Sequence, residues 1–290
     1  MEKAKLLIEE PVTILIDGDI LVYRVASVIE EPIHWGDGWW GIYGDATEGC
    51  QQLDWEIHKL LQEVNDIQGW RVNIETASQF NIQIALSSST NWRTEVLPTY
   101  KQNRANKPKP VLWNPLREYL LEKYNALVWD NLEADDVIGI LASPKTIVIS
   151  DDKDFQNCPC LLYRPMKKTL TKVTRKTAIM HHLMQTLTGD SADGYSGCPQ
   201  VGPVKAKEIL QEGTWQEVVG AYEHFGLGEE DALVQSRVAY ILQKKSEYQN
   251  RTGKVKLWLP IKIERISKNA YIYEQRTVPT VSPENMPKRT

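Results

Sequence analysis

The chain has 290 residues, of which 42% are hydrophobic and 25% are charged, as is usual for one large globular domain or two modest ones. It has no apolar run near 18 residues, and glutamates stand near its start where a signal peptide would carry an apolar core. We therefore expect no membrane span, no secretion and a cytoplasmic protein whose four cysteines are reduced.

At face value, the net charge of −4 argues against a nucleic-acid partner. However, eight of the 38 acidic residues fall in clusters that could surround metal ions, which leaves 30 against 34 Lys and Arg. The rest of the surface would then be mildly basic. The distribution of charge therefore matters more than its sum.

The first part of the chain alternates short apolar runs with amphipathic segments. Runs rich in β-branched residues predict buried parallel strands at 13–16, 82–86 and 146–149, with a fourth candidate at 126–129. Apolar residues three and four apart predict helices at 50–67, 116–124 and 133–141. This alternation predicts an α/β fold in which helices flank a parallel central sheet.

After about residue 174 the pattern becomes entirely helical, with helices predicted at 174–187, 204–210, 215–225 and 232–244. A Gly-, Ser-, Asp- and Pro-rich stretch separates the first two of these helices. Its Gly202-Pro203 pair is typical of a tight helix entry whose backbone N–H groups can hold a phosphate, and Lys205 adds charge there. From Arg251 the chain is rich in Lys and β-formers, and we expect a loose tail.

Acidic residues cluster at the ends of the predicted strands and at the start of one helix: Asp17, Glu133, Asp135, Asp136, Asp152 and Asp154. Ligands of open α/β sheets bind beyond the carboxyl ends of the strands, so these acids should meet at one edge. Capping explains a single acid at a helix start, but converging clusters repel one another unless cations neutralise them. Ligands that are all oxygen favour Mg²⁺ or Mn²⁺ over zinc.

A basic segment at 97–109 carries Lys101 and Arg104, which would share one face of a helix with Tyr100 beside them. One interpretation is a solvated basic helix. The other is a phosphate clamp in which Tyr100 gives a stacking platform for a terminal base.

With these residues assembled, the chain resembles the 5′-nuclease (flap endonuclease) superfamily, which includes the nuclease domain of bacterial DNA polymerase I. Five ordered motifs between about residues 12 and 212 carry the resemblance: ILIDGD, VLPTYKQNR, EADDVIGILA, VISDDKDFQ and LTGDSADGYSGCPQVGPVKAKEIL. By its size, the chain is most similar to the 5′→3′ exonucleases of short-tailed bacteriophages.

The resemblance implies three parts in the chain. Residues 1–185 would form a PIN-like (resolvase-like) α/β catalytic core with a helical arch at about 90–125. Residues 186–250 would form an all-α helix–hairpin–helix (H3TH) DNA-binding segment, and 251–290 a C-terminal extension.

The resemblance also implies hydrolysis with two divalent cations, Mg²⁺ or Mn²⁺. Five acids would hold them directly or through water: Asp17, Glu133, Asp135, Asp152 and Asp154. Three more would complete the second site: Asp136, Asp190 and Asp193. Lys101 would stabilise the scissile phosphate and Arg104 would grip phosphate, with Arg24 close to the site. The Val201-Gly202 turn would grip duplex DNA and hold a potassium ion on its carbonyls.

Two departures from the family pattern matter. Family members commonly have another acid after the strand at 82–86, where this chain has Ser87-Ser88-Ser89, so Asp19 or water is expected to replace a ligand. Gln200 stands where a first glycine is usual in the hairpin, which affects the expected turn and the potassium site.

Two further features allow alternative interpretations. The Trp-rich stretch with Trp35, Trp39 and Trp40 fits core packing or a loop lid, and also stacking on DNA ends or a docking patch for a partner. The basic run from Arg164 to Lys176 fits an extension of the DNA track or a solvated face.

The leading functional hypothesis is a 5′→3′ exonuclease on duplex DNA, with flap cleavage or removal of RNA from RNA–DNA hybrids as related activities. The alternatives are a PIN-type ribonuclease and a DNA-binding protein that has lost activity. The helix–hairpin–helix argues against the first alternative, and eight matched carboxylates with Lys101 argue against the second. The sequence leaves the oligomeric state open.

Overall fold

The computed structural model describes residues 12–69, 80–260, 262–267, 270–274 and 280–281. A five-stranded sheet at its centre has the order β4-β1-β5-β6-β7. Its strands are β1 (Val12–Asp17), β4 (Phe80–Ala85), β5 (Ile147–Ile149), β6 (Cys160–Arg164) and β7 (Thr169–Val173). The first four are parallel and β7 is antiparallel to β6, so one edge collects four carboxyl ends. The predicted α/β fold is confirmed.

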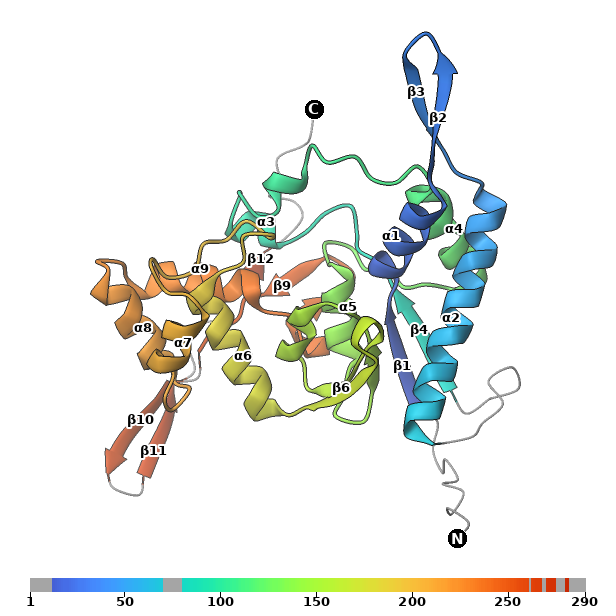
Figure 1. Cartoon of the computed structure of the whole chain (residues 1–290). Coiled ribbons are helices and arrows are strands. Elements are labelled where there is room, and N and C mark those ends of the chain that lie inside the picture. Colours follow the sequence, from blue (N-terminus) through green and yellow to red (C-terminus); the bar gives the residue numbers. More distant parts are fainter. Residues whose placement is uncertain (1–11, 70–79, 261, 268–269, 275–279, 282–290) are drawn as a thin grey trace.

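Helices cover both faces of this sheet because its central strands are apolar on both sides. Ile14 and Ile16 of β1 pack with α1 (Gly18–Ile29), α2 (Ala46–Gln68) and α4 (Trp113–Tyr124) in one core. Leu15 points the other way and packs with α5 (Ala134–Leu141) in a second core. Figure 1 shows α1, α2 and α4 together on one side of β1.

The later helices form a separate group with a core of their own, seen at the left of Figure 1. They are α6 (Arg175–Thr188), α7 (Pro203–Ile209), α8 (Trp215–His224) and α9 (Glu229–Ala239). The helix predicted at 232–244 is too long, since α9 ends at Ala239 and not near Lys244. The chain beyond it becomes extended, and the buried Ile241 and Leu242 join the core of the sheet instead.

Two expected elements differ from the prediction in the described residues. The fourth strand candidate is reduced to a single bridge between Leu127 and Ala85, since Asn125 and Asn131 on either side adopt positive φ angles. The arch is not a continuous helix: α3 (Arg93–Val96) and the 3₁₀ helix η2 (Gln102–Arg104) are joined by turns. Pro98 offers no N–H there and Lys101 has a φ of 55°, so Lys101 and Arg104 do not share a helix face.

The Trp-rich stretch is a two-stranded hairpin of β2 (Glu31–Gly36) and β3 (Trp39–Tyr43) that projects from the molecule (Figure 1). Trp35, Trp39 and Trp40 are 72%, 74% and 67% exposed. Core packing, one of the interpretations of these side chains, is therefore wrong.

The C-terminal stretch is more ordered than expected. After η5 (Lys245–Glu247) come β8 (Tyr248–Gln249), β9 (Lys254–Lys256), β10 (Lys262–Ser267), β11 (Ala270–Glu274) and β12 (Thr280–Val281). Val255 and Leu257 are buried in the core of the sheet, so the loose tail does not begin at Arg251. Residues 282–290, where the tail was expected to end, lie outside the described residues. Within the described part of the chain, no helix has the length and hydropathy to cross a membrane.

Candidate active site

Asp17 and Asp152 lie at the same edge because β1 and β5 are neighbours in the sheet. Asp17 ends β1 and caps α1, accepting a hydrogen bond from the Ile20 N–H at 3.2 Å. The Ser150 hydroxyl, just after β5, donates to the other oxygen of Asp17 at 3.0 Å. Asp152 caps the 3₁₀ helix η3 (Lys153–Asn157) by accepting from the Asp154 N–H at 2.8 Å. Strand order thus gathers carboxylates that are far apart in the chain.

The start of α5 brings further acids to this edge. Glu133 is the N-cap of the helix and Asp135 lies in its first turn. The Ser87 hydroxyl, just after β4, accepts from the Ala134 N–H at 3.0 Å and so holds the helix start against the sheet. Charge interactions connect Asp135 with Asp152, Asp17 and Glu133, and all four acids therefore share one electrostatic environment.

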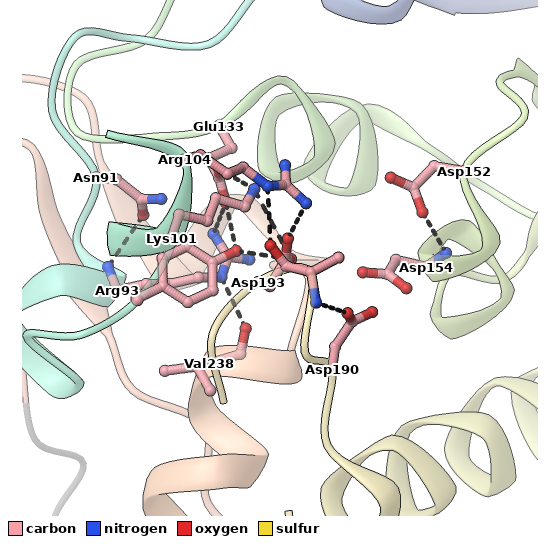
Figure 2. Close-up of polar contacts among 12 residues, drawn as sticks. Asn91, Arg93, Lys101, Arg104, Glu133, Asp152, Asp154, Asp190, Asp193 and Val238 are labelled. Atoms are coloured by element: carbon pink, nitrogen blue, oxygen red, sulfur yellow. Dashed lines mark hydrogen bonds and ion pairs between the residues drawn. The ribbon is translucent and has the colours of Figure 1, made fainter. Parts of the chain in front are cut away.

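A turn after α6 supplies Asp190 and Asp193. Figure 2 shows these two acids between Lys101 on one side and Asp154 on the other. The Lys101 N–H donates to the Asp193 carbonyl at 2.8 Å, and the Lys153 ammonium lies 2.6 Å from an Asp190 oxygen. The beginning of the helical group is thereby tied to both the sheet edge and the basic segment.

Lys101 is directed into the acid cluster. Its ammonium lies 2.5 Å from Glu133 and 3.8 Å from Asp193. Burial alone would raise the pKa of Glu133, but the ion pairs with Lys101 and Arg93 lower it to about 2. In turn, these carboxylates outweigh burial and raise the pKa of Lys101 above its usual value, so this lysine stays charged.

The neighbours of Lys101 differ from each other in role. Arg104 is about half exposed and its guanidinium lies 2.6 Å from Asp193, so it lies on the solvent-exposed side of the acid cluster. Tyr100 is only 5% exposed and its hydroxyl donates to Glu133 at 3.0 Å. The prediction of Tyr100 as a stacking platform for a base is wrong, because its ring is covered by protein.

Arg93 is a residue that the sequence reasoning missed. It is 3% exposed, and its guanidinium donates to Glu133, to both oxygens of Asp136 and to the carbonyls of Val238 and Tyr240. It therefore fixes Glu133 relative to the end of α9 (Figure 2). The only signal in the sequence was an arginine directly after Trp92, at the start of the expected arch.

Asp136 does not fit its predicted place among the metal ligands. It is fully buried, and each of its oxygens already accepts two hydrogen bonds, from Arg93, from the Trp92 indole and from the Leu242 N–H. A carboxylate whose acceptor positions are filled in this way has no lone pair left for a cation. It contacts the same arginine as Glu133, and its role is structural.

Three other acids, Asp17, Asp135 and Asp154, form no salt bridge with a described residue, and the acids around them repel them. Burial, with the charge of Asp19 beside it, raises the pKa of Asp17 to about 7. Burial and then Asp152 raise the pKa of Asp154 to about 7, and the same two causes place the pKa of Asp135 well above its usual range. Burial likewise raises the pKa of Asp193.

No three acid, His or Cys side chains in the described part of the chain form a ready metal site. Lys101 and Lys153 instead lie against Glu133 and Asp190. The donor set nevertheless fits hard divalent cations, because it consists of carboxylate oxygens whose pKa values are raised by burial and by the negative charge of neighbouring acids.

The serines after β4 have a structural explanation. The Ser87 N–H donates to Asp19 at 2.9 Å, so Asp19 lies beside the end of β4, where the sequence lacks an acid. Arg117 forms an ion pair with Asp19 and also donates to the Ser87 carbonyl at 2.7 Å. Asp19 is thus neutralised by an arginine.

The remaining predicted DNA contacts lie on both sides of the acids. Arg24 forms an ion pair with Glu56 at 3.0 Å and lines a small cavity together with Asp17. Gly202 and Lys205 are exposed at the start of α7, beside the turn whose geometry was in question. Gln200 adopts a φ of 57° there, the left-handed conformation that favours a glycine at this position.

The model of the 5′-3′ exonuclease N-terminal, resolvase-like domain matches residues 12–182. The chain belongs to this family. It is 28% identical to the exodeoxyribonuclease of Enterobacteria phage T3 over 85% of this chain and 92% of that protein. It is 32% identical to a flap endonuclease Xni of Vibrio vulnificus over 44% and 56% of the respective chains.

Solved structures show the same fold. The T5 D15 protein crystallised with metal ions covers 78% of this chain and 88% of its own, with a TM-score of 0.53 and 15% identity. The bacteriophage T5 D15 flap endonuclease in complex with DNA and metal ions covers the same shares, with a TM-score of 0.52 and 16% identity. This 5′-3′ exonuclease family member is therefore a nuclease with a resolvase-like core.

Proposed function

We propose that this nuclease hydrolyses phosphodiester bonds from the 5′ ends of duplex DNA and depends on divalent cations. The observation that carries the proposal is the convergence of acids from β1, α5, η3 and the turn after α6 around Lys101 (Figure 2). The named activities of the phage T3 and Vibrio relatives, and the metal ions and DNA of the T5 structures, support it.

Seven acids would hold the cations directly or through water: Asp17, Glu133, Asp135, Asp152, Asp154, Asp190 and Asp193. When bound, Mg²⁺ or Mn²⁺ would lower the pKa of an attacking water and stabilise the leaving oxygen. Asp136 is left out because Arg93 and backbone groups occupy it.

The basic residues at the cluster have different tasks in this proposal. Lys101 stays charged and would move from Glu133 to the scissile phosphate, where it stabilises negative charge in the transition state. Arg104, about half exposed on the solvent-exposed side of the acid cluster, would position the adjoining phosphate. Arg24 and the Gly202–Lys205 turn would grip the DNA on either side. A potassium ion at that turn remains a prediction.

The domain division follows from the same scheme. We propose residues 1–185 as the catalytic core and 186–250 as the helix–hairpin–helix segment, with α6 packing against both. The C-terminal extension over 251–290 begins with a stretch that completes the core of the sheet.

The test is digestion of 5′-labelled duplex DNA, single-stranded DNA, RNA and RNA–DNA hybrid, each with Mg²⁺ or with EDTA. Metal-dependent release of short products from duplex 5′ ends is the expected result. Cleavage of RNA alone would instead favour the PIN-type ribonuclease, and binding without cleavage would favour an inactive DNA-binding protein.

A further inference from the structure

The charges of this chain are segregated in a way that the acid cluster does not explain. No Asp or Glu occurs from residue 155 to 189, whereas this stretch contains six Lys and Arg. We call these six residues the basic strip: Arg164, Lys167, Lys168, Lys172, Arg175 and Lys176. By contrast, residues 25–58 contain seven Asp and Glu and no Lys or Arg.

The basic strip begins at the active-site edge of the sheet. Arg164 ends β6, and its guanidinium donates to the Asp151 carbonyl at 2.7 Å. The Met166 N–H in the 3₁₀ helix η4 (Pro165–Lys167) donates to the Asp151 side chain at 3.0 Å. Pro165 also lines the small cavity that Asp17 and Arg24 share. Arg164 and η4 therefore contact Asp151, the residue directly before Asp152 of the acid cluster.

From this edge the strip follows β7 away from the site. The strand runs antiparallel to β6 and is last in the order of the sheet, so its outer side pairs with no other strand of that sheet. Its five residues span about 17 Å, and they lead from Lys168 to Arg175 and Lys176 at the start of α6.

The strip is available to a ligand. Lys167, Lys168, Lys172, Arg175 and Lys176 are exposed, and no salt bridge joins any of the six cations to a described residue. Uncompensated like charges in one row repel one another, whereas a polyanion that lies along them would gain from all of them at once.

We propose that the basic strip binds the phosphodiester backbone of the nucleic acid whose end is held at the acid cluster, and that the strand leaves the site along β7. This rests on the proposed nuclease function. The exposed Trp hairpin is the competing exit, and it fits poorly, because the hairpin carries Glu31 and Asp37 and no cation to meet phosphates.

The direct test is the salt dependence of binding in EDTA, measured by fluorescence anisotropy on a 30-base-pair duplex and a 30-nucleotide single strand. The triple variant Lys167→Gln, Lys168→Gln, Lys172→Gln should reduce the slope of log K against log salt by about 2–3 on the duplex, or about 2 on the single strand. The matched control is Arg251→Gln with Lys256→Gln, two exposed cations outside the helix–hairpin–helix segment, and its slope should equal that of the wild type.

A smaller slope on either substrate supports the proposal and tells which form of nucleic acid lies on the strip. Unchanged slopes on both would overturn it and make the strip a solvated face. A loss of affinity in Trp39→Ala with Trp40→Ala, together with an unchanged slope in the lysine triple, would place the exit on the hairpin instead.

Hydrolysis assays distinguish a failure of this proposal from a failure of the proposed nuclease function. Cleavage of the small diester bis-p-nitrophenyl phosphate needs only the acid cluster, so the triple variant should retain it while kcat/KM on long DNA falls about tenfold, mainly through KM. An equal loss on both substrates would contradict a role outside the site. Absence of metal-dependent cleavage in the wild type would refute the nuclease proposal and leave the binding result standing.

Discussion

The acids at the sheet edge fall into two groups that differ in their counter-ions. The paired acids Glu133, Asp136, Asp190 and Asp193 each form an ion pair with Arg93, Lys101, Arg104 or Lys153. The unpaired acids Asp17, Asp135, Asp152 and Asp154 form no salt bridge with a described residue. The pKa of Glu133 is about 2, whereas those of Asp17 and Asp154 are about 7.

This difference teaches how one fold can hold so many carboxylates. Side chains of the protein neutralise one half of the cluster, so that half folds in a fixed arrangement without metal. The other half stays short of positive charge, and divalent cations would complete it. Without metal, the paired acids therefore stabilise the site, whereas the unpaired acids destabilise it until cations bind.

The adjacent pair Asp135 and Asp136 gives the largest expected contrast. Asp135→Asn should lower kcat by at least about 100-fold and raise the metal-free melting temperature, because it removes a repelling charge. Asp136→Asn should lower the free energy of unfolding by about 3–5 kcal/mol, since it leaves Arg93 buried with too little negative charge. Denaturant unfolding in EDTA and DNA cleavage in Mg²⁺ measure both. Destabilisation by both variants would erase the distinction between the two groups.

Lys101→Ala tests whether this lysine moves from Glu133 to the scissile phosphate. We expect kcat to fall by about 10²–10³-fold, since the charge acts on the transition state. The dissociation constant for DNA should change by less than about tenfold, because only one phosphate contact is lost. Lys107→Ala, an exposed lysine in the same segment, is the control. Comparable losses in kcat and affinity would make Lys101 a binding residue only.

Divalent cations should stabilise the unpaired half selectively. At a concentration near 100 times the dissociation constant, Mg²⁺ should add about 2.7 kcal/mol of stability, which corresponds to a rise of roughly 5–10 °C in melting temperature. Monovalent salt of equal ionic strength is the control in the same thermal scan. An equal rise with both salts would argue against specific cation binding by these acids.

The smallest expected effect is the change of metal-free stability with pH. The pKa values of Asp17 and Asp154 are raised to about 7 in the folded state, well above the usual value for an aspartate. The folded state therefore binds more protons than the unfolded state between about pH 4 and 7, and metal-free stability should fall as the pH rises through this window.

Glu133 has the opposite sign, because its stabilising contribution is lost only as the pH falls toward about 2. In EDTA, the urea concentration at the unfolding midpoint should be lower at pH 8 than at pH 5. Mg²⁺ should abolish this difference. A higher midpoint at pH 8 than at pH 5 in EDTA would contradict the shortage of positive charge.

Much of the fold could be predicted because its signals are local. Buried β-branched runs located β1, β4 and β5, and apolar spacing located α2, α4 and α5 within a few residues. The errors lie where long-range packing decides. The hairpin residues Trp35, Trp39 and Trp40 have the composition of a core, but no partner surface in the described part of the chain covers them. Tyr100 has the composition of a surface platform, but the acid cluster buries it.

The sequence by itself determined which residues carry charge, where the strands end in acids, and that Lys101 lies in one of five ordered motifs that resemble the family. It could do so because strand ends and motif spacing are properties of adjacent residues. Only the tertiary structure decided which acids are neutralised from within. Arg93 reaches Asp136 across 43 residues and Val238 across 145, and no local pattern encodes such pairings.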